Sequence, residues 1–75
     1  MKQYDFDVKL NTKHFMILID TNACYGYFEH DHYGDGVAGG LWFDPDKVLL
    51  DYDGVFELPK EVEEALIKEG YDTSI

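Results

Sequence analysis

The segment 29–35, Glu-His-Asp-His-Tyr-Gly-Asp, contains the densest group of potential metal ligands in the sequence. In an extended backbone, His30 and His32 point the same way, as two ligands of one metal ion would. The acidic residues of the segment could complete the ligand set. A solvated loop explains the same composition, because no second pair of ligands follows in the sequence. Metal binding at His30 and His32 is therefore an alternative hypothesis, and no cofactor is expected.

Catalytic chemistry finds little support in the remaining residues. Ser74 is the only serine and lies next to the C-terminal residue, which argues against a serine triad. Cys24 and a histidine could form a thiolate pair, although a single cysteine in an aromatic strand is typically a small core residue. The glycines match neither a phosphate-binding loop nor a dinucleotide fingerprint. We therefore expect a protein that is not an enzyme.

Carboxylates are the most abundant chemical groups, and the pattern Asp-x-Asp occurs three times, at Asp5/Asp7, Asp44/Asp46 and Asp51/Asp53. On a strand, residues i and i+2 share a face at a spacing of about 6.6 Å. This equals about two steps of one DNA strand at ~3.4 Å each, so such carboxylates could imitate a phosphate track. Tyr52 lies between two of them and is a candidate anchor residue. The competing interpretation places the aspartates in turns and on solvated faces.

Net charge restricts the class of partner. Sixteen acidic residues face six lysines and no arginine, so the formal net charge is −10. The chain lacks the planar arginine fork that binds phosphate bidentately, and its field repels anionic polymers and membranes. We therefore expect no direct binding to nucleic acid and no membrane association. The favoured partner is a protein with a basic surface, for example in a nucleoprotein complex.

Length and composition indicate a single domain over residues 1–75. Six Tyr, five Phe and one Trp supply large side chains for a small core. A single cysteine leaves no internal disulfide, which favours a reducing, cytoplasmic setting. The longest apolar stretch, 15–19, has five residues, and the N-terminus lacks the apolar run of a signal peptide.

Alternation of apolar and polar residues predicts strands, and turn-forming residues separate them. The predicted strands are 4–10, 14–20, 24–29, 38–43 and 48–52, with an exposed loop at 30–36. The second is apolar on both faces, which is typical of a central strand covered on both sides. Gly39 and Gly40 indicate a bulge or a close backbone approach.

A helix is predicted from Pro59 to Gly70, docked on the sheet because a helix this short is unstable alone. Residues 72–75 are expected to fray. The predicted fold class is α+β: a small antiparallel β-sheet of four to five strands with one C-terminal helix packed on it.

Residues 50–62, together with Ala65-Leu66 and Gly70-Tyr71, resemble the tail of small proteins of phages and prophages. Size and acidity are similar to those of phage-encoded anti-CRISPR and anti-restriction proteins, many of which block a nucleic-acid-binding surface. The resemblance covers under a third of the chain. Because such proteins share no common motif, it assigns no functional residue.

The leading hypothesis is a non-enzymatic acidic protein that binds and blocks a basic surface of a nucleic-acid-handling partner, as an anti-CRISPR or DNA-mimic inhibitor would. Its candidate contacts are the six aspartates of the Asp-x-Asp pairs, with Tyr52. The alternatives are the metal site at His30 and His32, and a self-associating protein that forms a homodimer through an exposed edge and the third strand. The leading hypothesis requires carboxylates that gather in a patch and are not neutralised by lysines.

Overall fold

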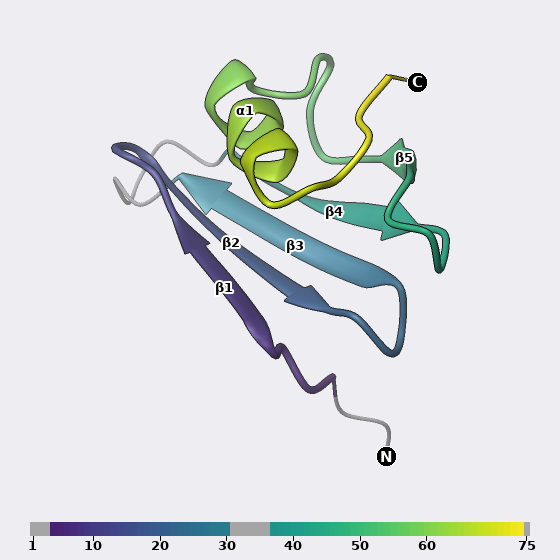
Figure 1. Cartoon of the computed structure of the whole chain (residues 1–75). Coiled ribbons are helices and arrows are strands. Elements are labelled where there is room, and N and C mark those ends of the chain that lie inside the picture. The colour runs from purple at the N-terminus through teal and green to yellow at the C-terminus, as the bar shows by residue number, and fades with distance from the viewer. Residues whose placement is uncertain (1–3, 31–36, 75) are drawn as a thin grey trace.

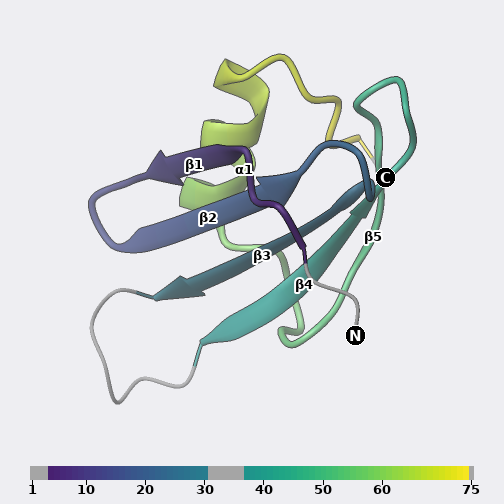
Figure 2. The same ribbon diagram turned by 90° about the horizontal axis from the view of Figure 1, so that it is seen from below.

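The computed structural model describes residues 4–30 and 37–74, which form one antiparallel sheet with one helix on it (Figure 1). Five strands lie side by side in chain order: β1 (Val8–Asn11), β2 (Phe15–Asp20), β3 (Tyr25–His30), β4 (Ala38–Phe43) and β5 (Leu49–Tyr52). Helix α1 (Lys60–Lys68) lies on one side of the sheet (Figures 1 and 2). The predicted α+β class and the C-terminal helix are confirmed.

The hydrophobic core lies between α1 and the sheet. Phe15, Ile17 and Ile19 of β2 are buried there, because alternate residues of a strand point to the same face. Val62 and Leu66 of α1 are fully buried against this face. Each aliphatic side chain removed from water in this way contributes ~1.5–3 kcal/mol. A helix of nine residues therefore depends on its docking.

The opposite face of the sheet has no second layer within the described residues (Figure 2). Met16 and Leu18 of β2 point to this face and are half-buried. The prediction that this strand is covered on both sides is wrong. The reason is that the single amphipathic helix has one apolar stripe and can cover only one face.

The two ends of α1 largely follow the predicted signals. Pro59 occupies the capping position before the helix, one residue earlier than its predicted place inside the first turn. Gly70 has a positive φ of 92°, a left-handed conformation that glycine adopts without a Cβ clash. The chain then reverses, and the Tyr71 amide donates to the Leu66 carbonyl at 3.0 Å.

The segment after Gly70 is ordered, which corrects the expectation that residues 72–75 fray. Asp72 forms a parallel bridge with Val48, and its carbonyl accepts the Leu49 amide at 2.8 Å. Thr73 is buried and its hydroxyl donates to Glu63 at 3.3 Å. The unpaired backbone groups at the start of β5 attract this segment, because an edge strand offers free donors and acceptors. Residue 75 lies outside the described residues.

The first strand is shorter than predicted. Residues 4–7 carry the alternation of a strand, but β1 begins at Val8. Side-chain contacts hold the preceding segment: Asp7 accepts hydrogen bonds from Thr21, and the Tyr4 ring stacks on Tyr25. Local alternation does not distinguish these contacts from strand pairing.

Gly39 lies where β4 passes close to the segment that follows β5. A Cβ atom at this residue would overlap the carbonyl oxygen of Asp53. The predicted close backbone approach is confirmed at Gly39, whereas the irregularity in strand pairing lies between Trp42 and Phe43. The predicted loop at 30–36 falls outside the described residues except for His30, which ends β3. In the part of the chain that is described, no helix is long and apolar enough to cross a membrane.

Candidate functional site

The predicted contact aspartates do not form rows on strands. Asp5/Asp7 precede β1, Asp44/Asp46 lie in the β4–β5 turn, and Asp51/Asp53 straddle the end of β5. Because no pair lies within one strand, the ~6.6 Å strand repeat does not apply to any of them. The proposed likeness to the spacing of a phosphate track therefore has no support from strand geometry and stays a prediction.

Carboxylates gather instead at one end of the sheet, where the β2–β3 turn, the β4–β5 turn and the chain termini meet. We call this region the acidic end and define it by Asp5, Asp7, Asp20, Asp44, Asp46 and Asp72. Asp20 and Asp72 were not predicted as members. Their positions depend on contacts between segments far apart in the sequence.

Hydrogen bonds bring the acidic end together. Asp7 accepts the amide and the hydroxyl of Thr21 at 3.0 and 2.6 Å, and Asp20 accepts the Asp5 amide at 2.8 Å. Thr21 and Asp44 line the same small cavity of about 80 Å³. The Thr21 side chain lowers the pKa of Asp7, and the Ala23 and Asp5 amides lower the pKa of Asp20. Both carboxylates are therefore ionised at neutral pH.

Lysines do not neutralise these carboxylates. Within residues 4–30 and 37–74, no lysine ammonium lies within 4.0 Å of a carboxylate oxygen, and the ion pair found there joins His14 to Glu61. Lys47 lies beside the acidic end, but its ammonium is placed over the Tyr71 ring, 5.4 Å from the centroid. The described lysines thus form no ion pair with these carboxylates, and Lys47 is the one that lies beside them.

Asp51 and Asp53 lie along β5, away from the β4–β5 turn. Asp51 faces Trp42 across the β4–β5 pairing. Asp53 accepts the Gly40 amide at 2.7 Å, which fixes the direction of its carboxylate. Tyr52, the predicted anchor, is half-buried and packs partly against the core, so it is less accessible than an anchor on the open sheet surface.

An aromatic row crosses the uncovered face of the sheet, and we define it by Tyr4, Tyr25 and Trp42. The ring centroids of Tyr4 and Tyr25 are 4.7 Å apart, and those of Tyr25 and Trp42 are 5.6 Å apart. Tyr4 and Trp42 remain 45% and 38% exposed. Burial, with the nearby Tyr4 and Asp53, raises the pKa of Tyr25.

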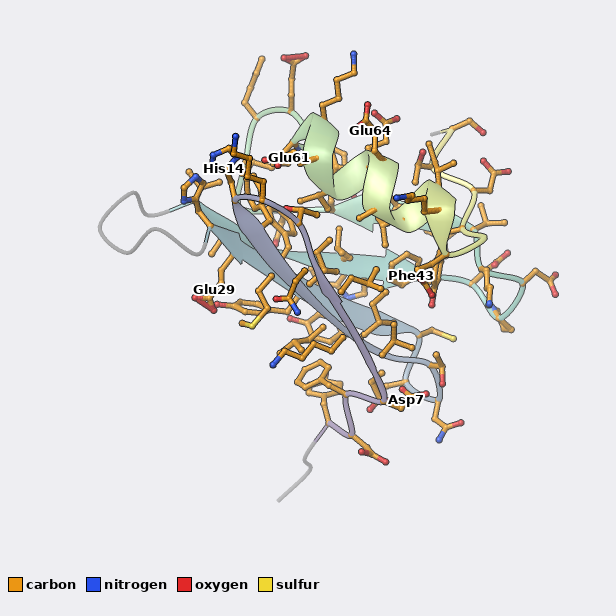
Figure 3. The ribbon with its side chains drawn as sticks, turned by 60° about the vertical axis from the view of Figure 1, so that its left-hand side comes forward. Asp7, His14, Glu29, Phe43, Glu61 and Glu64 are labelled. Carbon is orange, nitrogen blue, oxygen red and sulfur yellow. The ribbon has the colours of Figure 1, made fainter. Side chains whose placement is uncertain are left out.

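The remainder of this uncovered surface is apolar with a carboxylate at its margin. We call the whole surface the open face; it comprises the aromatic row with Met16, Leu18, Tyr27 and Glu29. The Tyr27 hydroxyl donates to Glu29 at 2.8 Å, and this bond raises the pKa of Tyr27. Figure 3 shows Glu29 on the side of the sheet away from α1, whereas Phe43 points toward the helix. In the sequence, the alternate residues of β3 and β4 that point away from the core indicate this face.

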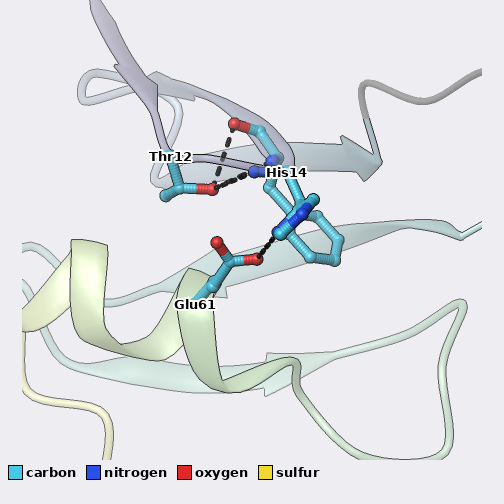
Figure 4. A network of polar contacts seen from close by, with 4 residues as sticks. Thr12, His14 and Glu61 are labelled. Carbon is cyan, nitrogen blue, oxygen red and sulfur yellow. Dashed lines mark hydrogen bonds and ion pairs between the residues drawn. The ribbon is translucent and has the colours of Figure 1, made fainter.

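His14 and His30 lie at the other end of the sheet. His14 Nδ1 lies 3.0 Å from a Glu61 oxygen and so connects the β1–β2 turn to the first turn of α1 (Figure 4). The His14 and His30 rings stack with centroids 5.8 Å apart. His32, the second predicted metal ligand, lies outside the described residues. Among the described residues, no three His, Cys, Asp or Glu side chains are grouped to hold a metal ion.

Cys24 directly precedes β3 and His30 is its last residue, so the two lie about 20 Å apart at ~3.3 Å per strand residue. A thiolate pair between these two residues is therefore excluded by distance. Cys24 has a free thiol and lines the small cavity at the acidic end.

Comparisons of the whole chain with protein-family models, curated proteins and solved structures found no match. Function is accordingly inferred from the charge and shape of these surfaces.

Proposed function

We propose that this protein binds and blocks the basic surface of a nucleic-acid-handling partner, in the manner of anti-CRISPR or DNA-mimic inhibitors. The observation that carries the proposal is a net charge of −10 whose carboxylates have no lysine partner within the described residues. Such a field attracts a basic surface and accelerates its approach. A free cysteine fits the reducing, cytoplasmic setting in which such partners act.

Two features of the acidic end support this function. First, backbone and hydroxyl donors hold several of its carboxylates in fixed directions, so they need not be ordered again on binding. Second, turns and chain termini make up this end, and its carboxylates are exposed or half-exposed except that of Asp20, which is buried. Mimicry of nucleic acid would then come from total negative charge and its placement, because no Asp-x-Asp pair lies within one strand that would fix its spacing.

The test begins with capture from a nuclease-treated bacterial lysate on the immobilised protein. Each captured protein is purified, and its binding to labelled DNA or RNA is measured with increasing amounts of the acidic protein. We expect a captured nucleic-acid-binding protein that releases its nucleic acid, with an effect that weakens steeply above ~0.2 M salt. A captured partner that keeps its nucleic acid, or the absence of any such partner, would overturn the proposal.

Charge-matched variants separate the location of charge from its amount. Asp5→Asn with Asp46→Asn removes two charges from the acidic end, at side chains that accept no hydrogen bond within the described residues. Glu57→Gln with Glu64→Gln removes two exposed charges elsewhere. We expect the first pair to weaken inhibition by about two- to thirty-fold, from ~0.2–1 kcal/mol for each of two exposed charges, and the second pair to have little effect. Equal effects would contradict a role for the acidic end.

A further inference from the structure

The open face has the composition of a binding surface. Tyr4, Trp42 and their neighbours remain partly exposed on a sheet face that carries no second layer in the described chain. None of these side chains belongs to the core or packs against it, in contrast to Tyr52 and Val8. Contiguous apolar and aromatic surface of this kind marks interaction sites.

Gly40 determines how the Trp42 side chain lies on this face. A Cβ atom at Gly40 would stand 2.9 Å from Trp42 Cη2, so the indole covers the glycine backbone. The same glycine donates its amide to Asp53, which brings a carboxylate next to the indole. Asp51 faces Trp42 from β5. The aromatic row therefore has two carboxylates beside its Trp42 end.

Carboxylates also stand at the other margins of the open face. Glu29 is held by the Tyr27 hydroxyl, and Asp5 follows Tyr4 in the chain. One cation, Lys9, lies opposite Leu18 on β1. Rings with adjacent carboxylates match the guanidinium group, which stacks on aromatic faces and donates in a fork to a carboxylate.

Charge argues against the other occupants of such a face. A second copy of this chain would bring an identical acidic margin against the first, at a net charge of −10 on each molecule. A purely apolar helix would desolvate the marginal carboxylates without pairing them. A segment with guanidinium groups can stack on the rings and pair with the carboxylates at the same time.

We propose that the open face docks an arginine-bearing segment of the partner protein, with guanidinium groups stacked on the aromatic row and paired with Asp51 and Asp53. Each of these aspartates uses one oxygen to accept a backbone amide, and within the described residues the second oxygen accepts none. The inference deepens the proposed function and rests on it for the existence of a basic partner. It adds a second contact surface, next to the acidic end, and the residue type recognised there.

The direct test compares two labelled peptides of equal length and charge, one with arginines and one with lysines at the same positions. Binding is followed by fluorescence anisotropy and by emission of Trp42, the single tryptophan of the chain. We expect the arginine peptide to bind at least about three-fold more tightly and to change Trp42 emission, because stacking favours the guanidinium. Equal affinities with unchanged emission would overturn the inference.

Matched variants locate the contact. Tyr25→Leu and Tyr4→Leu each remove one ring of the row, and Phe56→Leu removes an almost fully exposed ring that makes no ring contact in the described structure. We expect the first two to lose the preference for arginine and the Phe56 variant to keep it. Tyr4 lies before β1, so its replacement remains informative if the Tyr25 variant fails to fold.

Charge variants and mass measurements complete the design. Asp51→Asn should weaken arginine-peptide binding several-fold more than Glu64→Gln on the helix; equal effects would indicate diffuse attraction and overturn the inference. Light scattering that shows a dimer with Trp42 protected from quenchers would also overturn it. Arginine selectivity without release of nucleic acid from a captured partner would retain this inference and reject the inhibitory function. Release of nucleic acid without a preference for the arginine peptide would retain the inhibitory function and reject this inference.

Discussion

Replacing Gly39 with alanine is predicted to destabilise the protein, whereas the same change at the adjacent Gly40 is predicted to be nearly neutral. The two residues point to opposite faces of β4. A Cβ at Gly39 would overlap the backbone carbonyl of Asp53, which cannot rotate away. A Cβ at Gly40 would lie 2.9 Å from the outer edge of the Trp42 indole. Because this indole is a side chain at the surface, it can move aside at little cost.

The loss in free energy of unfolding expected for Gly39→Ala is the sum of the contacts that the added Cβ displaces. Overpacking against fixed backbone costs about 1–3 kcal/mol. Moving Asp53 away also strains two hydrogen bonds: one from the Asp53 amide to the Gly40 carbonyl (3.1 Å) and one from the Gly40 amide to the Asp53 carboxylate (2.7 Å). Together they contribute about 2–4 kcal/mol if lost. Alanine offsets about 0.4–1 kcal/mol by restricting the unfolded chain. We expect a net loss of about 2–4 kcal/mol, a large part of the ~4–11 kcal/mol typical of a domain this size.

Urea unfolding followed by far-UV circular dichroism measures both free energies of unfolding. Gly40→Ala should lose less than about 1 kcal/mol while shifting the emission of Trp42, whose indole it displaces. A Gly39→Ala variant within about 0.5 kcal/mol of the parent would refute the close approach of β4 to the segment after β5. Equal losses for the two variants would refute the assignment of the two faces.

Three further predictions address the helix, the acidic end and the tail. Leu66→Ala should lower the free energy of unfolding by about 2–5 kcal/mol in urea titrations, since Leu66 is fully buried; a loss below about 1 kcal/mol would contradict the docking of α1. The Ala23 and Asp5 amides hold the pKa of Asp20 below the ~3.9 of an unfolded chain, so its stabilisation is present above that pH and is lost as the pH falls through the lower folded pKa. Asp20→Asn should therefore flatten the decrease in stability as the pH falls below about 5, and an unchanged slope would exclude Asp20 as the source of that decrease. Deleting residues 72–75 should cost about 1–3 kcal/mol by removing two backbone hydrogen bonds to the start of β5, and an unaltered melting temperature would restore the expectation of a frayed tail.

Local sequence signals were sufficient for the elements that neighbouring residues specify. Alternation, apolar runs and β-favouring aromatics together located all five strands, and β4 has the bounds predicted for it. Proline before α1 and Gly70 after it marked the ends of the helix within one residue. Such signals work because they report conformational preferences of residues adjacent in the chain.

The same signals misplaced residues whose environment comes from distant segments. Alternation in residues 4–7 resembled a strand, yet Thr21 and Tyr25 hold this segment through side chains. The tail looked polar and free, yet Asp72 pairs with the edge of β5. No local signal places His14 beside His30, because the two rings stack only through the pairing of β2 with β3.

The amino-acid sequence by itself determined the net charge of −10, the excess of aspartate at turns, and a central strand that is apolar on both faces. Only the tertiary structure decided which of the two faces α1 covers, and hence that Tyr4, Tyr25 and Trp42 stand together on the other. These three residues come from three segments separated by about twenty residues each. Their meeting depends on strand order and register, which are set by the packing of the whole sheet and not by any local preference.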